Sequence, residues 1–125
     1  MAKILVVDDS SLMRMKCSKL LGEHGYDVIE AKNGVEAIEK YKQFMPDGVL
    51  LDVVMPEMHG IVALREIRKF DPTAKVAMLT AMGQRNIVMG ALQEGARDFV
   101  VKPFRPGRVL DMVVRLLGNP ELDLM

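Results

Sequence analysis

Short apolar segments alternate with amphipathic segments along the whole chain. Four apolar segments predict strands at Lys3–Val7, Gly48–Leu51, Lys75–Leu79 and Asp98–Val101, and a loosely alternating segment predicts a strand at Tyr26–Ala31. The segments between them carry apolar residues at three- and four-residue steps, which predicts one helix after each strand. The apolar positions of these helices run over Met13–His24, Val35–Tyr41, Ile61–Ile67, Ile87–Leu92 and Val109–Leu117. Alternation of strand and helix predicts a parallel sheet covered by helices on both faces.

Polar residues, glycines and prolines separate these elements. Ser10 or Ser11 is expected to cap the first helix, and Asn33-Gly34 is expected to form a turn before the second. Gly60 is expected to adopt backbone angles that other residues avoid. Gly118-Asn119-Pro120 should end the last helix. A chain of this length forms one domain with a single core, so we assign residues 1–118 to that domain and 119–125 to a short frayed tail.

Charged and hydroxyl side chains follow four of the five predicted strands. Asp8 and Asp9 follow the first, Asp52 the third, Thr80 the fourth and Lys102 the fifth. In doubly wound sheets the carboxyl ends of the strands form the usual binding site. Like charges placed together disfavour mutual ionisation unless a cation intervenes, and oxygen ligands favour Mg²⁺ or Mn²⁺. The alternative is that each aspartate only caps a helix or forms a surface ion pair.

This set of side chains is suited to taking up a phosphoryl group. The Asp52 carboxylate would attack phosphorus, a divalent cation and the Lys102 ammonium would neutralise the phosphoryl oxygens, and the Thr80 hydroxyl would donate a hydrogen bond.

Composition excludes several other classes of function. The formal net charge is zero, which gives no support to binding of nucleic acid or anionic membranes. The single cysteine, Cys17, cannot form an internal disulfide, fits a reducing compartment, and is best explained as a small buried apolar residue. No apolar run approaches the length of about 20 residues needed to span a membrane. We therefore expect a cytoplasmic protein.

Four segments together resemble the receiver domain of two-component response regulators, most closely the stand-alone chemotaxis regulators of the CheY type. They are Ile4–Ser10, Leu51–Gly60, Leu79–Ala81 and Asp98–Phe104, and the resemblance extends from Lys3 to about Leu117. It implies a (βα)5 flavodoxin-like, doubly wound, five-stranded parallel sheet of order 2-1-3-4-5. It further implies a switch that catalyses only its own phosphorylation and dephosphorylation. Dephosphorylation is expected to be slow, because Val54 and Met82 stand where faster members carry polar side chains.

The resemblance assigns a role to each site residue. A histidine kinase would donate the phosphoryl group to Asp52. Asp9, Asp52 and the backbone carbonyl of Val54 would bind Mg²⁺ directly, with Asp8 reaching the ion through water. Lys102 would contact the phosphoryl group.

The resemblance also implies a cis bond and a conformational switch. The peptide bond from Lys102 to Pro103 would be cis. Thr80 would move toward phosphorylated Asp52, and Phe99 would turn inward with it, since both are expected at the ends of adjacent strands. The chain departs from the common pattern of the family at three positions. Phe99 replaces a frequent tyrosine, and His59 replaces the usual Asp or Asn and is expected to face solvent in a loop. Gly90 falls inside the fourth predicted helix and should weaken it.

Other functions fit the sequence less well. Mg²⁺-dependent phosphatases with an aspartyl intermediate that resemble haloacid dehalogenases carry a D-x-D motif after the first strand, whereas this chain has Asp8-Asp9-Ser10. A nucleotide-binding domain would need a glycine-rich loop there.

The output is expected to be partner binding through helix 4, strand 5 and helix 5. The flagellar motor switch is the leading target, and a phosphorelay intermediate or a receiver from a longer regulator is the alternative. We expect a monomer, with phosphorylation-linked dimerisation left open.

Overall fold

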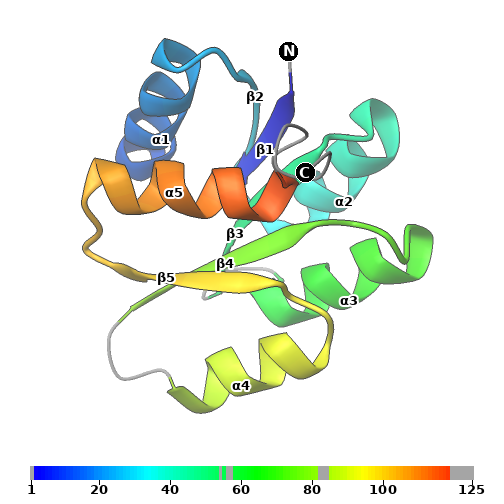
Figure 1. Cartoon of the computed structure of the whole chain (residues 1–125). Helices are drawn as coiled ribbons and strands as arrows, with labels where there is room; N and C mark the ends of the chain where they lie inside the picture. The colour runs from blue at the N-terminus through cyan, green and yellow to red at the C-terminus, as the bar shows by residue number, and fades with distance from the viewer. Residues whose placement is uncertain (1, 54, 56–57, 82–84, 119–125) are drawn as a thin grey trace, which may run out of the picture.

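Five strands and five helices alternate along the chain in a computed structural model, which describes residues 2–53, 55, 58–81 and 85–118 (Figure 1). The elements are β1 Lys3–Val7, α1 Ser11–Glu23, β2 Asp27–Ala31, α2 Gly34–Phe44, β3 Gly48–Asp52, α3 Gly60–Phe70, β4 Val76–Ala81, α4 Arg85–Gln93, β5 Asp98–Lys102 and α5 Pro106–Leu117. All strand pairs are parallel, and their order is β2-β1-β3-β4-β5. The predicted flavodoxin-like fold and strand order are confirmed.

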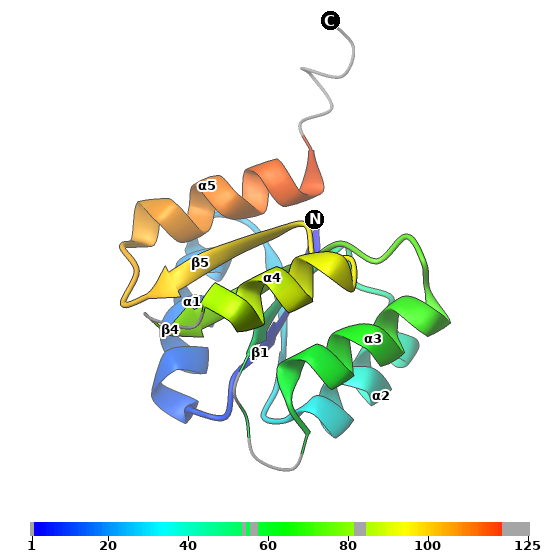
Figure 2. The same ribbon diagram turned by 90° about the horizontal axis from the view of Figure 1, so that it is seen from below.

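Two apolar cores lie on opposite faces of the sheet because successive side chains of a strand point to opposite sides. On β1, Leu5 and Val7 pack with α2 and α3, while Ile4 and Val6 pack with α1 and α5. Figure 2 shows α5 on one side of the sheet and α2, α3 and α4 on the other. All four of these β1 side chains are fully buried between the two layers of helices.

Side-chain caps fix where three helices begin. The Ser10 hydroxyl accepts a hydrogen bond from the Met13 amide, and the Asn33 side chain accepts one from Glu36. Asn33 and Gly34 therefore do not form a separate turn, because Asn33 is the cap of α2 and Gly34 its first residue. His59 is not the solvent-facing loop residue that we expected. It is half-buried and caps α3, with Nδ1 accepting a hydrogen bond from the Ile61 amide at 3.2 Å.

The register of β4 and β5 corrects one expectation about the switch residues. Thr80 lies opposite Val101, one residue before the end of β4, whereas Phe99 lies opposite Met78 near the start of β5. Phe99 therefore does not end a strand beside Thr80. Thr80 is buried, whereas the Phe99 side chain is 37% exposed.

Candidate functional site

The carboxyl ends of β1 and β3 bring two buried aspartates together. These strands are neighbours in the sheet, but the helices that follow them, α1 and α3, cover opposite faces. The chain therefore leaves the two strand ends in opposite directions, and the space between the ends is open to side chains. Asp8 directly follows β1 and Asp52 is the last residue of β3. Asp8 is 1% exposed and Asp52 is 7% exposed. Two carboxylates this deeply buried require compensating cations or hydrogen bonds.

Lys102, the last residue of β5, supplies one such cation. Its Nζ lies 2.8 Å from Asp8 Oδ2 and 3.5 Å from Asp52 Oδ2. The Ser10 amide donates to the other oxygen of Asp8, at 2.9 Å. The Lys102–Pro103 peptide bond is cis. The structure thus brings Asp8, Asp52 and Lys102 into direct contact across three strand ends.

A third carboxylate completes an all-oxygen cluster. One oxygen from each of Asp8, Asp9 and Asp52 lies within 4.8 Å of the others, and Asp9 is exposed to solvent. Oxygen ligands at this separation, with one side open to water, fit Mg²⁺, which keeps part of its hydration shell. A bound divalent cation would also offset the repulsion among three carboxylates that one ammonium leaves uncompensated. Val54, whose carbonyl the resemblance adds to these ligands, lies outside the described residues, as does Met82.

Burial and charge shift the proton affinities of the site in a consistent direction. Burial raises the pKa of Asp52 to about 6, since Asp8 adds to this effect and Lys102 only partly opposes it. Burial alone would lower the pKa of Lys102, but its hydrogen bond to Asp8 and the charge of Asp52 hold that pKa above its ordinary value. At neutral pH the site therefore holds an ionised but poorly solvated Asp52 carboxylate beside a protonated lysine.

This proton affinity predicts that Asp52 lowers the stability of the metal-free protein at neutral pH. The pKa of Asp52 in the folded state exceeds its ordinary value of 3.8, so the stability contributed by proton binding is complete below about pH 4 and is lost as the pH rises through about 6. In EDTA at pH 7.5, Asp52→Asn should raise the free energy of unfolding by about 1–3 kcal/mol, measured by urea denaturation. The gain should shrink as the pH falls toward 4, and a gain independent of pH would contradict the argument.

Two residues of the site region have structural roles that the sequence did not indicate. A Cβ on Gly60 would lie 2.2 Å from the Asp52 carbonyl oxygen, because the first turn of α3 packs directly against the end of β3. Among the described glycines, positive φ angles occur at Gly25, Gly95 and Gly118 and not at Gly60, so our expectation of unusual backbone angles was wrong. Arg14 is the second such residue, because its Nη1 donates to the Asp8 carbonyl at 2.7 Å.

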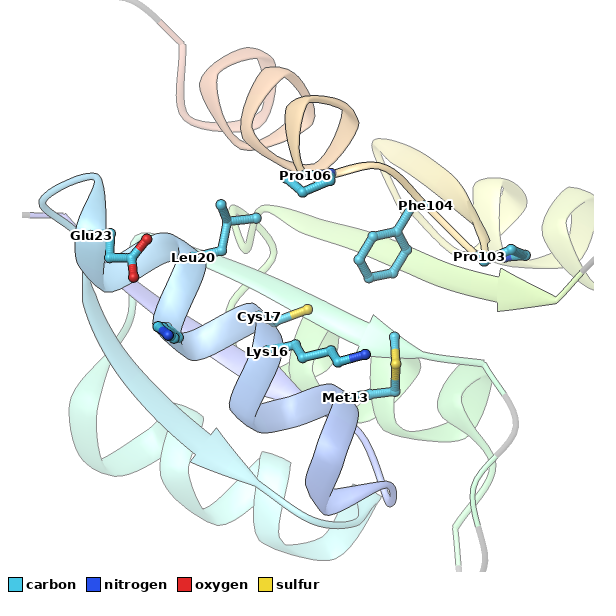
Figure 3. Close-up of a pocket in the computed structure, with 9 residues that line it drawn as sticks. Met13, Lys16, Cys17, Leu20, Glu23, Pro103, Phe104 and Pro106 are labelled. Carbon is cyan, nitrogen blue, oxygen red and sulfur yellow. The ribbon is translucent and has the colours of Figure 1, made fainter.

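A groove of about 530 Å³ lies between α1 and the segment that joins β5 to α5 (Figure 3). Phe104 points into it opposite Cys17, and Lys16 lies at its edge. Cys17 is 2% exposed, and burial raises the pKa of its thiol to about 11. A thiol in this environment is not activated as a nucleophile, which agrees with its interpretation as a small buried apolar residue.

Comparison with known proteins gives one consistent family. The sequence model of the response regulator receiver domain family matches residues 4–114 of this chain. The chemotaxis protein CheY of Bacillus subtilis is 48% identical over 117 residues, which cover 93% of this chain and 98% of that protein. CheY of Thermotoga maritima is 50% identical over 110 residues, covering 87% and 92%.

A solved structure extends this similarity to three dimensions. A crystal structure of a complex of CheX and CheY with BeF₃ and Mg²⁺, from Borrelia burgdorferi, matches with a TM-score of 0.89 and 36% identity. The match covers 94% of this chain and 90% of that chain. In the part of this chain that the structure describes, no helix has the length and apolar character needed to cross a membrane.

Proposed function

The chain belongs to the response regulator receiver family and is a CheY-like receiver, and from this premise we propose that Asp52 accepts a phosphoryl group from a histidine kinase. The observation that carries the proposal is the contact of one lysine with two buried aspartates at three strand ends. The protein is a switch that changes its partners, and it catalyses only its own phosphorylation and slow dephosphorylation. We assign residues 1–118 to the receiver domain, and residues 119–125, which we assigned to a tail, lie outside the described residues.

The side chains of the site divide the work of phosphoryl transfer. An Asp52 carboxylate oxygen attacks phosphorus, the bond from phosphorus to the donor imidazole nitrogen breaks, and the imidazole leaves with a proton from water. Lys102, already 3.5 Å from Asp52, donates a hydrogen bond to a transferred oxygen. Thr80, buried in β4, donates another. Asp8, Asp9 and Asp52 would hold Mg²⁺ or Mn²⁺, which would supply positive charge against the phosphoryl oxygens.

The output surface lies at the edge of the sheet formed by α4, β5 and α5. Large apolar side chains on these three elements are exposed by 37% or more, namely Met89, Leu92, Phe99, Val101 and Val114. β5 lies at one edge of the described sheet, so no other described strand pairs with its outer side. Inward rotation of Phe99 with Thr80 would remove an aromatic ring from this surface and change what the surface binds.

Beryllofluoride, used as a phosphoryl mimic, should therefore act well beyond the metal site. With Mg²⁺ present, it should shift the amide resonances of α4 and β5 as well as those near Asp9 and Asp52. A variant with Phe99→Leu should keep the shifts near the aspartates and lose most of those in β5. Shifts confined to the aspartate loops in the parent protein would exclude coupling between the site and this surface.

Chemotaxis is the pathway that we propose, because two relatives that match most of the chain are named chemotaxis proteins. The downstream partner would be a component of the flagellar motor switch or a protein of the CheX kind, as in the Borrelia complex. We expect both partner classes to bind the beryllofluoride form at least tenfold more tightly than the free form, measured by titration with purified proteins. Equal affinity for the two forms would favour a phosphorelay intermediate instead.

A further inference from the structure

Arg14 connects the start of α1 to both strands that lie beneath it. Its Nη1 donates a hydrogen bond to the backbone carbonyl of Asp8 at 2.7 Å. Its Nε lies 3.3 Å from Glu30 Oε1 on β2. The Arg14 side chain is 19% exposed, so this guanidinium is largely covered. A charge-assisted hydrogen bond from a planar, partly buried donor fixes the orientation of its acceptor more firmly than a surface contact does.

The bond from Arg14 completes the set of contacts around Asp8. The Asp8 amide donates to Ala31, one carboxylate oxygen accepts from Ser10, and the other accepts from Lys102. The remaining group is the carbonyl, which belongs to the peptide linking Asp8 to Asp9. Holding that carbonyl fixes the plane of the peptide, which contains the Asp9 nitrogen and Cα, and so fixes where the Asp9 residue starts relative to Asp8.

We propose that Arg14 is a positioning residue for the cation site, which acts by holding the Asp8–Asp9 peptide so that the Asp9 carboxylate faces Asp8 and Asp52. The inference rests on the proposed binding of Mg²⁺ by these three carboxylates. Mg²⁺ requires near-octahedral geometry, so a ligand that is free to rotate binds it less well. Residues that orient metal ligands typically change metal affinity by about 10–100-fold when they are replaced.

The sign of the effect separates positioning from simple electrostatics. Arg14 is itself a cation near the site, so removing its charge should by Coulomb's law strengthen the binding of Mg²⁺. Removing its hydrogen bond should weaken that binding. Arg14→Met combines the two effects, whereas Arg14→Lys keeps the charge but cannot reproduce the planar donor pair that bonds Asp8 and Glu30 together.

The test is an amide NMR titration of the full chain with MgCl₂, without phosphodonor. Arg14→Met should weaken Mg²⁺ binding by roughly tenfold and Arg14→Lys by about threefold. Lys40→Met is the matched control. The Lys40 ammonium also contacts Glu30, by donating to the Glu30 backbone carbonyl, and it pairs with Glu36. In the described structure no contact joins Lys40 to Asp8. This variant should leave the dissociation constant within about twofold of the parent value.

Each outcome of the titration supports or overturns one claim. Tighter or unchanged binding in Arg14→Met, with the parent protein binding Mg²⁺, would overturn the positioning role and leave the proposed function intact. A parent protein that does not bind Mg²⁺ would overturn the proposed function itself. Urea denaturation in EDTA reports folding separately, and if Arg14→Met does not fold, Arg14→Lys decides by the same criterion. The rate of labelling by acetyl phosphate at saturating Mg²⁺ should recover in both variants, which a general loss of structure would prevent.

Discussion

Incubation with acetyl phosphate and Mg²⁺ should add one phosphoryl group to the parent protein and none to Asp52→Asn. Asp52 is a buried carboxylate that shares the Lys102 ammonium with Asp8, at 3.5 Å from Nζ. An amide nitrogen or oxygen in its place is a far weaker nucleophile, so the loss of labelling should exceed about 1,000-fold. Intact-mass spectrometry measures the added group directly.

Three controls define this experiment. EDTA should abolish labelling of the parent protein, because the three carboxylates then lack the cation that offsets their repulsion. Asp111→Asn, on the exposed surface of α5, should be labelled like the parent protein. Asp52→Asn should unfold cooperatively in urea, which separates lost chemistry from lost structure. Full labelling of Asp52→Asn, or undiminished labelling in EDTA, would refute the assignment of the phosphoacceptor.

Gly60→Ala should destabilise the protein by about 3 kcal/mol or more, although it adds a single methyl group. The new Cβ would lie 2.2 Å from the Asp52 carbonyl oxygen and 2.8 Å from the Val53 carbonyl oxygen. Both are backbone atoms of a buried segment, so neither can move aside as a flexible side chain would. The Gly60 amide also donates to the Val53 carbonyl, which ties α3 to the end of β3, the strand that carries Asp52.

Gly90→Ala provides a matched control for the same substitution inside another helix. The nearest atom to a Cβ there is Ile61 Cδ1 at 3.6 Å, an ordinary van der Waals contact. Alanine favours helix over glycine by about 1 kcal/mol, so this variant should be as stable as the parent protein or more stable. Urea denaturation of both variants measures the two free energies of unfolding. Equal effects of the two substitutions would show that the close approach of α3 to β3 is not what requires glycine.

The sequence predicted the central strands of the fold well because they are continuous apolar runs. β1 and β3 are buried along nearly their whole length, and the structure places both within one residue of the predicted bounds. The same topology explains why the site residues could be identified. Parallel strands all end at one edge, so Asp8, Asp52 and Lys102 had to meet there once the order was known.

What the sequence did not predict depends on distances between elements. Nothing in the sequence around Gly60 distinguishes a glycine needed for its backbone angles from one needed for a close approach. The position of Phe99 depended on how β5 is paired with β4, and a shift of two residues along a strand cannot be seen from apolar content alone. Arg14 looks like any helix-surface arginine until the carbonyl of Asp8 is placed beside it.

The burial of Cys17 makes the chain convenient for site-specific labelling. It is the only cysteine in the sequence, and with a pKa of about 11 only roughly one thiol in 10,000 is ionised at pH 7. Maleimide dyes and nitroxide spin labels react with accessible thiolates, so the parent protein is an almost unreactive background for them. A cysteine introduced on the solvent-exposed side of α4 could therefore be labelled without first replacing Cys17, and its spectrum would report the motion of that helix alone.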